Sequence, residues 1–166
     1  TVYAWDLSVR MAHFDQTHAY FNGTSVFLKA HGHEDKPHQV QLHRPNGSKY
    51  DKWRIATTLK ATNSDPTEFG TFMASDYDDL IDHPVEIADY TRIQFEACGV
   101  PHEMVITGVH RADTERLGRD LKTICEAQIQ FFGTPAPMNR YVFMTMALGG
   151  YGGLEHRSST SLLCSR

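Results

Sequence analysis

Alternating apolar and polar positions recur through the first part of the chain. A period of two is typical of strands that bury one face. We therefore expect strands over residues 3–9, 25–28, 40–42 and 53–57, with turn residues at 22–23 and 45–47. Short strands at this spacing favour an antiparallel β-sandwich or saddle.

The middle of the chain changes in character. Residues 75–84 are dense in acidic side chains and end at Pro84, which predicts either a charged turn or a short helix. Two further strands are expected, over residues 90–95 and 104–109.

The last part combines helical and strand periods. A helix is predicted from an N-cap at Asp113 or Thr114 to Phe132, because Gly133 and Pro135 then supply a stop. Its apolar positions lie near one face, which should pack on the core: Leu117, Leu121, Ile124 and Phe131, with Cys125 beside them. An apolar run over 141–148 predicts a buried strand, followed by a glycine-rich segment over 149–153. The fold class is therefore α+β.

The composition is that of a globular protein, with 166 residues, 40% of them hydrophobic and 22% charged. The net charge of −4 argues against a nucleic-acid-binding surface. The acidity is local, since residues 75–110 carry −7 while 1–74 carry +1 and 111–166 carry +2. No apolar run reaches the ~18 residues of a membrane span. Three scattered cysteines, Cys98, Cys125 and Cys164, do not form a disulfide framework, so we expect a cytoplasmic protein without a membrane partner.

Ten histidines invite a search for a metal site. His31 and His33 stand two apart, a spacing that zinc sites use, but the polar residues that follow them predict an exposed loop. The helical zinc signature His-Glu-x-x-His is missing, because His33-Glu34 is followed by Pro37 and His102-Glu103 by Ile106 at the position of the second histidine. We therefore expect no metal site in this chain.

Nucleophilic and phosphate-binding motifs are also missing. Residues 158–161 offer hydroxyl groups near His156, but no Gly-x-Ser-x-Gly elbow is present. Cys164 has no neighbour in the sequence that predicts a lowered pKa, which favours a buried structural role. The glycine run at 149–153 lacks the Lys-Ser/Thr of a P-loop.

The segment Gly152-Gly153-Leu154-Glu155 has a more specific physical meaning. Glycines beside a core strand let another backbone approach closely. A peptide along such an edge would form main-chain hydrogen bonds, and Glu155 would bind its free α-amino group. The alternative, a glycine loop with an ordinary surface glutamate, remains open on the residues alone.

At this segment the sequence resembles the glycyl aminopeptidase family of zinc metallopeptidases. The resemblance lies in residues 150–160, Gly-Tyr-Gly-Gly-Leu-Glu-His-Arg-Ser-Ser-Thr, and in the blocks at 21–28, 79–86 and 95–102. The spacing of Phe131-Phe-Gly and Tyr141-Val-Phe agrees as well. The resemblance runs over nearly all 166 residues, and the four blocks together are specific.

The resemblance implies a fold, a site and a boundary. Members of this family are several times longer and join an N-terminal β-domain to a thermolysin-like catalytic domain and a PDZ-like module. Residues 1–90 would be the later part of the β-domain. Residues 91–166 would be the first part of the catalytic domain, a small sheet plus one long helix. Gly152, Gly153 and Glu155 match the motif that binds the substrate's main chain and free amine.

The same resemblance implies what this chain lacks. The zinc-binding helix and a downstream glutamate ligand are expected after Arg166, and the chain starts at Thr1 without a Met, so we expect an internal fragment. The fragment should be inactive, while its zinc-containing parent removes N-terminal residues such as Gly or Ala. The expected partners are peptide N-termini and the rest of the parent chain.

Two other kinds of function remain as alternatives. One is a β-rich interaction or carbohydrate-binding module, in which Trp5, Trp53 and the tyrosines supply stacking faces. The other is a non-catalytic segment whose edge strand binds peptide termini without cleaving them.

Overall fold

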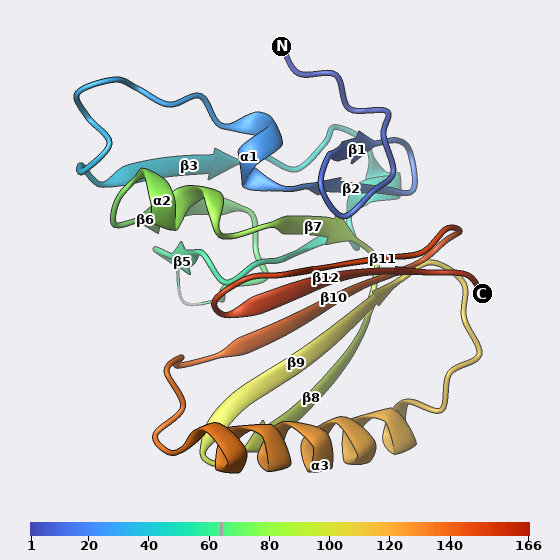
Figure 1. Ribbon diagram of the computed structural model, residues 1–166. Coiled ribbons are helices and arrows are strands. Elements are labelled where there is room, and N and C mark those ends of the chain that lie inside the picture. Colours follow the sequence, from blue (N-terminus) through green and yellow to red (C-terminus); the bar gives the residue numbers. More distant parts are fainter. Residues whose placement is uncertain (64) are drawn as a thin grey trace.

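In the computed structural model, residues 1–63 and 65–166 are described, and over these residues the chain forms three sheets and three α-helices (Figure 1). A four-stranded sheet has the order β1 (Ala12–Phe14), β2 (His18–Phe21), β7 (Val85–Ala88), β4 (Arg54–Ala56). A three-stranded sheet has the order β3 (His38–Leu42), β6 (Gly70–Ala74), β5 (Lys60–Ala61). A five-stranded sheet has the order β11 (Gly152–Glu155), β12 (Ser159–Cys164), β10 (Tyr141–Ala147), β9 (Val100–Thr107), β8 (Thr91–Ala97). The expected α+β class is confirmed.

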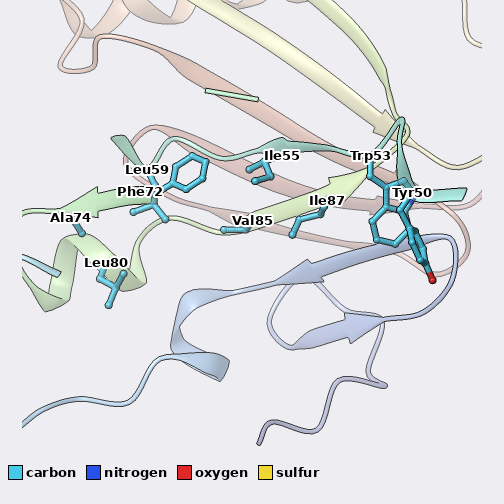
Figure 2. Packing of buried hydrophobic residues seen from close by; sticks show 9 residues of the cluster. All are labelled: Tyr50, Trp53, Ile55, Leu59, Phe72, Ala74, Leu80, Val85 and Ile87. Carbon is cyan, nitrogen blue, oxygen red and sulfur yellow. The ribbon is translucent and has the colours of Figure 1, made fainter. Parts of the chain in front are cut away.

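The first two sheets are antiparallel throughout and share one core. Figure 2 shows its buried side chains, which come from β4, β6, β7, α2 (Tyr77–Ile81), the 3-10 turn η1 (Ser48–Tyr50) and the connections between them. They are Tyr50, Trp53, Ile55, Leu59, Phe72, Ala74, Leu80, Val85 and Ile87. The expected strands at 40–42 and 53–57 correspond to β3 and β4. The acidic segment forms the short helix α2, with Asp76 as its N-cap.

Two strand predictions in this region were wrong. Residues 3–9 form no strand, and only Trp5 makes an isolated bridge, to His13. Val9, at the end of this segment, is buried against Met146 and Leu163 of the five-stranded sheet, while Tyr3 and Trp5 are exposed. Residues 25–28 were expected to be extended, but α1 spans Gly23–Val26. A Cβ on Gly23 would lie 2.8 Å from the Cα of Ile81, so this tertiary contact requires a glycine at the start of α1.

The five-stranded sheet mixes directions. Strands β9, β10 and β12 run parallel, while β8 and β11 pair antiparallel at the two edges. The strands expected at 90–95, 104–109 and 141–148 are therefore present with shifted ends. Parallel neighbours need a crossover connection, and α3 (Thr114–Phe132) supplies it between β9 and β10. The Asp113 carboxylate accepts from the N–H of Arg116 at 3.0 Å, which identifies Asp113 as the N-cap.

The buried stripe of α3 differs in part from the expected one. Leu117 and Leu121 pack against the sheet as predicted. The stripe continues at Cys125 and Ile129, in steps of four residues, and Ile129 is buried. Ile124 and Phe131 lie beside this line and are 57% and 81% exposed, so their assignment to the docking face was wrong.

The opposite face of the five-stranded sheet packs on the first two sheets. Ala56 of β4 joins a buried cluster with Val105 of β9 and Met144 of β10. The hydroxyl of Tyr20 lies at hydrogen-bonding distance, 2.8 Å, from Ser161 Oγ of β12. Glu103 of β9, 3% exposed, binds Arg92 and Arg140, and Arg140 also donates to the carbonyl of Thr57. Residues before and after position 90 therefore share a continuous interior.

Candidate peptide-binding edge

The segment singled out in the sequence forms an edge strand. Strand β11 lies at the end of the five-stranded sheet and pairs only with β12 among the described residues. The N–H of His156 donates to the carbonyl of Ser159 at 2.8 Å, so His156 and Ser159 form a hydrogen-bonded pair of the β11–β12 hairpin. Because hydrogen-bonded and non-hydrogen-bonded pairs alternate in antiparallel strands, Gly153 and Glu155 occupy the non-hydrogen-bonded pairs. Their backbone N–H and C=O groups point outward, away from β12.

The two residues also share one face of the sheet. Gly153 is opposite Leu162, and Glu155 is opposite Thr160. Thr160 is in turn beside Phe143, which packs on the side of the sheet that α3 covers. Side chains at paired positions lie on the same face. Figure 1 shows α3 along β8 and β9, at the other end of the sheet from β11, and Glu155 is exposed.

The fold does not need a glycine at position 153. A Cβ there would lie 3.7 Å from Leu162 Cδ2, an ordinary van der Waals distance. Gly150, just before the strand, is different, because its φ of +96° belongs to the region that favours glycine. At Gly153, the missing side chain leaves room at the sheet edge for an approaching backbone.

An apolar hollow of about 570 Å³ lies on the same side of the sheet. Its lining comes from β9, β10, the end of β12 and the first turn of α3, and includes Met104, Ile106, Ala147, Cys164 and Leu117. Cys164 lines this hollow and is half-buried, so the prediction of a buried structural role for it holds in part.

The turn between β11 and β12 is tied to the segment around α2. Asp82 accepts from the N–H of Arg157 at 3.2 Å, and its other oxygen lies 3.5 Å from His156 Nδ1. Ser158 Oγ donates to Thr58 Oγ1 at 3.0 Å. These contacts hold the end of the strand that carries Glu155.

A second set of bonds fixes the partners of that turn. Thr58 Oγ1 lies 2.6 Å from His83 Nδ1, and His83 Nε2 lies 3.1 Å from Asp79 Oδ1. The N–H of Ser75 donates to the other oxygen of Asp79 at 2.8 Å.

The same bonds shift the pKa values of the network. Burial alone would raise the pKa of Asp79, but the bonds from Ser75 and His83 outweigh this effect, so the pKa of Asp79 is lowered. Burial lowers the pKa of His156, in spite of the nearby Asp82. Sequence reasoning missed this network, because its members are distant along the chain.

Other candidates from the sequence are dispersed. His31 is 92% exposed and lies 3.6 Å from Glu34 in a loop, as expected for His31 and His33. Trp53 is buried at 3% exposure, so it offers no face for stacking on a sugar. Trp5 is 65% exposed, but one face of its ring stacks on His13.

The comparison with known proteins assigns the family. Residues 1–89 match the peptidase M61 N-terminal domain. The chain belongs to the peptidase M61 family. It is similar to the crystal structure of an aminopeptidase N family protein from Idiomarina loihiensis, with 48% sequence identity and a TM-score of 0.94. That match covers 99% of this M61 chain but 28% of the Idiomarina protein, so the chain spans little more than a quarter of its relative.

A more distant likeness concerns the fold alone. The M1 zinc metallopeptidase from Deinococcus radiodurans has a TM-score of 0.54 and 14% identity over 98% of this chain and 39% of that protein. No curated protein matches the chain. Zinc is named for the Deinococcus protein, whose likeness to this M61 chain concerns the fold alone.

The edge strand does not fit the zinc of such an enzyme. The long helix that packs on the same sheet, α3, carries no histidine. Among residues 1–63 and 65–166, one group of three metal-ligating side chains lies close together, and it belongs to the β1–β2 hairpin. No helix in the described part of the chain is both long and apolar enough to cross a membrane.

Proposed function

We propose that this M61 chain supplies the edge that binds the peptide N-terminus in a zinc-dependent aminopeptidase, with the zinc held by parts of the parent protein outside residues 1–166. The observation that carries the proposal is the arrangement of Gly153 and Glu155. Both present outward backbone groups and share one open face of an edge strand. The match to the M61 domain and the Idiomarina aminopeptidase N family protein supports the same activity.

The edge binds peptide in two ways. An extended peptide adds a strand beside β11 and pairs with the free N–H and C=O groups of Gly153 and Glu155. The exposed carboxylate of Glu155 then binds the peptide's α-ammonium group by a charge-assisted hydrogen bond. Only a peptide whose chain begins at this point can place an ammonium there, so cleavage is confined to the N-terminus.

The remaining features of the proposal rest on the resemblance. The start of a thermolysin-like catalytic domain would occupy residues 91–166, and the parent would prefer N-terminal Gly or Ala. The hollow beside α3 supports further chain packing on this face, because it is apolar and about 570 Å³ in volume.

Peptide binding can be tested on the chain itself. We expect Gly-Gly-Phe to shift the backbone amide resonances of Gly153 and Glu155 in an NMR titration, and N-acetyl-Gly-Gly-Phe to bind more weakly. Exposed charge pairs contribute about 0.2–1 kcal/mol, so the dissociation constants of the two peptides should differ by about 1.5- to 5-fold. Glu155→Gln should remove this difference. Equal binding of both peptides to the wild-type chain would contradict the role of Glu155.

Activity can be tested in the complete parent protein. Glu155→Ala should lower aminopeptidase turnover by about 10-fold or more, because the amine is no longer oriented. Zinc content measured on the same samples should be unchanged. Full activity of the variant would show that Glu155 does not bind the substrate amine.

A further inference from the structure

The β1–β2 hairpin brings together three side chains that favour metal ions. His13, Asp15 and His18 each offer a ligand atom, and these atoms all lie within 4.8 Å of one another. The pattern His-x-Asp-x-x-His is local, so one tight hairpin places all three. The sequence search missed it because it tested a two-residue histidine spacing and the helical zinc signature.

Asp15 keeps one oxygen free for a ligand. Its Oδ1 accepts from the N–H of Thr17, the hydroxyl of Thr17 and the N–H of His18, at 2.7, 2.7 and 3.1 Å. These bonds close the turn and fix the carboxylate. Its Oδ2 lies 3.4 Å from Nε2 of His13 and points to the cluster.

A buried carboxylate orients His18. Nδ1 of His18 lies 3.1 Å from Glu86 Oε1, and both side chains are 1% exposed. Thr107 Oγ1 donates to the same oxygen at 2.7 Å. The other ring nitrogen of His18 is then left for a ligand. A carboxylate behind a ligating histidine is the usual way in which proteins fix the ring and raise its basicity.

His13 has an unused ring nitrogen. Its Nδ1 is buried and has no hydrogen-bond partner among the described residues. The ring is stacked between His18, at a centroid distance of 4.9 Å, and Trp5, at 5.3 Å. Buried polar atoms in folded proteins normally have a partner. The nitrogen next to Asp15 is the other one: Nε2 of the same ring lies 3.4 Å from Asp15 Oδ2. The ring therefore offers Nε2 to a metal ion beside Asp15, while its Nδ1 is bonded by no group of the described residues.

We propose that His13, Asp15 and His18 form a divalent transition-metal site, of which Zn²⁺ is the simplest probe. Two imidazoles and one carboxylate suit Zn²⁺ and its first-row neighbours, and the exposed side of Asp15 leaves a coordination position for water. The site lies within residues matched by the M61 N-terminal domain, and none of its ligands is on a helix. It replaces the sequence-based expectation of no metal in this chain, and it does not depend on the proposed peptidase function.

Equilibrium dialysis of residues 1–166 with Zn²⁺ tests the proposal. We expect one bound ion per chain. His13→Gln and Asp15→Asn should each weaken binding by about 10-fold or more, while His31→Gln combined with His33→Gln should leave it unchanged. Asp15→Asn retains the Oδ1 acceptor of the turn, so it preserves the hairpin. Glu86→Gln, which retains Oε1 as an acceptor, should weaken binding about 10- to 100-fold if the carboxylate positions His18.

A second measurement needs no variant. In the wild-type chain, Zn²⁺ should shift the imidazole NMR resonances of His13 and His18 before those of His31 and His33. Co²⁺ should quench the fluorescence of Trp5, whose ring stacks on His13, and Trp5→Phe identifies that signal. No saturable binding, or binding that is lost only with His31 and His33, would overturn the proposal.

Discussion

His156 Nδ1 lies 3.5 Å from Asp82 Oδ1, and the other oxygen of Asp82 accepts from the N–H of Arg157. A single carboxylate in the M61 domain therefore holds the turn of the β11–β12 hairpin. Glu155 precedes this turn directly, so its position depends on a residue that is remote in the sequence.

Asp82→Ala should loosen the hairpin. The Asp82–Arg157 bond is exposed, so its loss costs about 0.5–1.5 kcal/mol, and the amides of β11 and β12 nearest the turn should exchange with solvent about 2- to 10-fold faster. Asp78→Ala is the matched control, because Asp78 is exposed on α2. Hydrogen exchange measured by NMR would contradict the contact if both variants behaved alike.

Acidification should destabilise the chain through His156. Its pKa in the folded state is lowered from 6.5 by burial. Below pH 6.5 the unfolded chain therefore takes up the proton first, and this contribution to stability, present above pH 6.5, is lost as the pH falls. His156→Asn keeps a donor near Nδ1 but does not titrate. Urea unfolding at pH 7.5 and 5.5 should show a smaller loss of stability in the variant.

His18 changes the stability of the folded chain with pH in the opposite direction to His156. Burial lowers its pKa, but the hydrogen bond and charge of Glu86 outweigh this and the net shift is upward. Its stabilisation is present below pH 6.5 and is lost as the pH rises through its raised pKa. His18 is present in both proteins, so the difference between wild type and His156→Asn isolates His156.

Gly153→Ala should separate folding from peptide binding. The new Cβ meets Leu162 Cδ2 at 3.7 Å, so the free energy of unfolding should change by less than about 0.5 kcal/mol. The methyl group would stand beside the outward N–H and C=O groups that are proposed to pair with the peptide, and binding of Gly-Gly-Phe should weaken. Gly150→Ala is the contrast, since its φ of +96° predicts a loss of about 1–2 kcal/mol. Unchanged peptide binding by Gly153→Ala would argue against a backbone docking there.

Tyr20→Phe should destabilise the whole chain. The Tyr20 hydroxyl donates to the carbonyl of Val9 at 2.8 Å and lies 2.8 Å from Ser161 Oγ, 141 residues further along the chain. Its removal leaves buried acceptors unpaired, at a cost of about 1–2 kcal/mol. Residues before and after position 90 share one interior. Far-ultraviolet circular dichroism and tyrosine fluorescence should therefore report a single unfolding transition, at a lower temperature in Tyr20→Phe than in the wild type. Two separate transitions would show that residues before and after position 90 unfold independently.

The chain alone should not hydrolyse a glycyl chromogenic substrate. The His-Glu-x-x-His pattern is missing from the sequence, and α3 carries no histidine. Incubation with Zn²⁺ and glycine p-nitroanilide should give turnover no faster than buffer, also in His13→Gln. Zinc-dependent turnover by the wild-type chain would contradict the prediction of an inactive fragment, and its loss in His13→Gln would assign the activity to the β1–β2 hairpin.

Local signals predicted some elements closely. The stop at Gly133 predicted the end of α3 to the residue, and the two candidate caps, Asp113 and Thr114, predicted its start to within one residue, because capping bonds form between residues close in the sequence. Gly152, Gly153 and Glu155 were singled out from the sequence and the family resemblance, and the pairing of β11 with β12 then decided that the backbone groups of Gly153 and Glu155 point outward. The helix face was predicted less well, since Ile124 is exposed where the apolar pattern placed it inside.

The sequence by itself determined the α+β class, the C-terminal end of α3 and the choice of residues 152–155 as the candidate site. Periodicity, caps and glycine placement act over short distances in the chain. Only the tertiary structure decided that Gly23 begins a helix against Ile81, that Asp82 holds His156, and that Glu86 stands behind His18. These contacts join residues far apart in the chain. Their formation depends on how the sheets pack, which no local pattern contains.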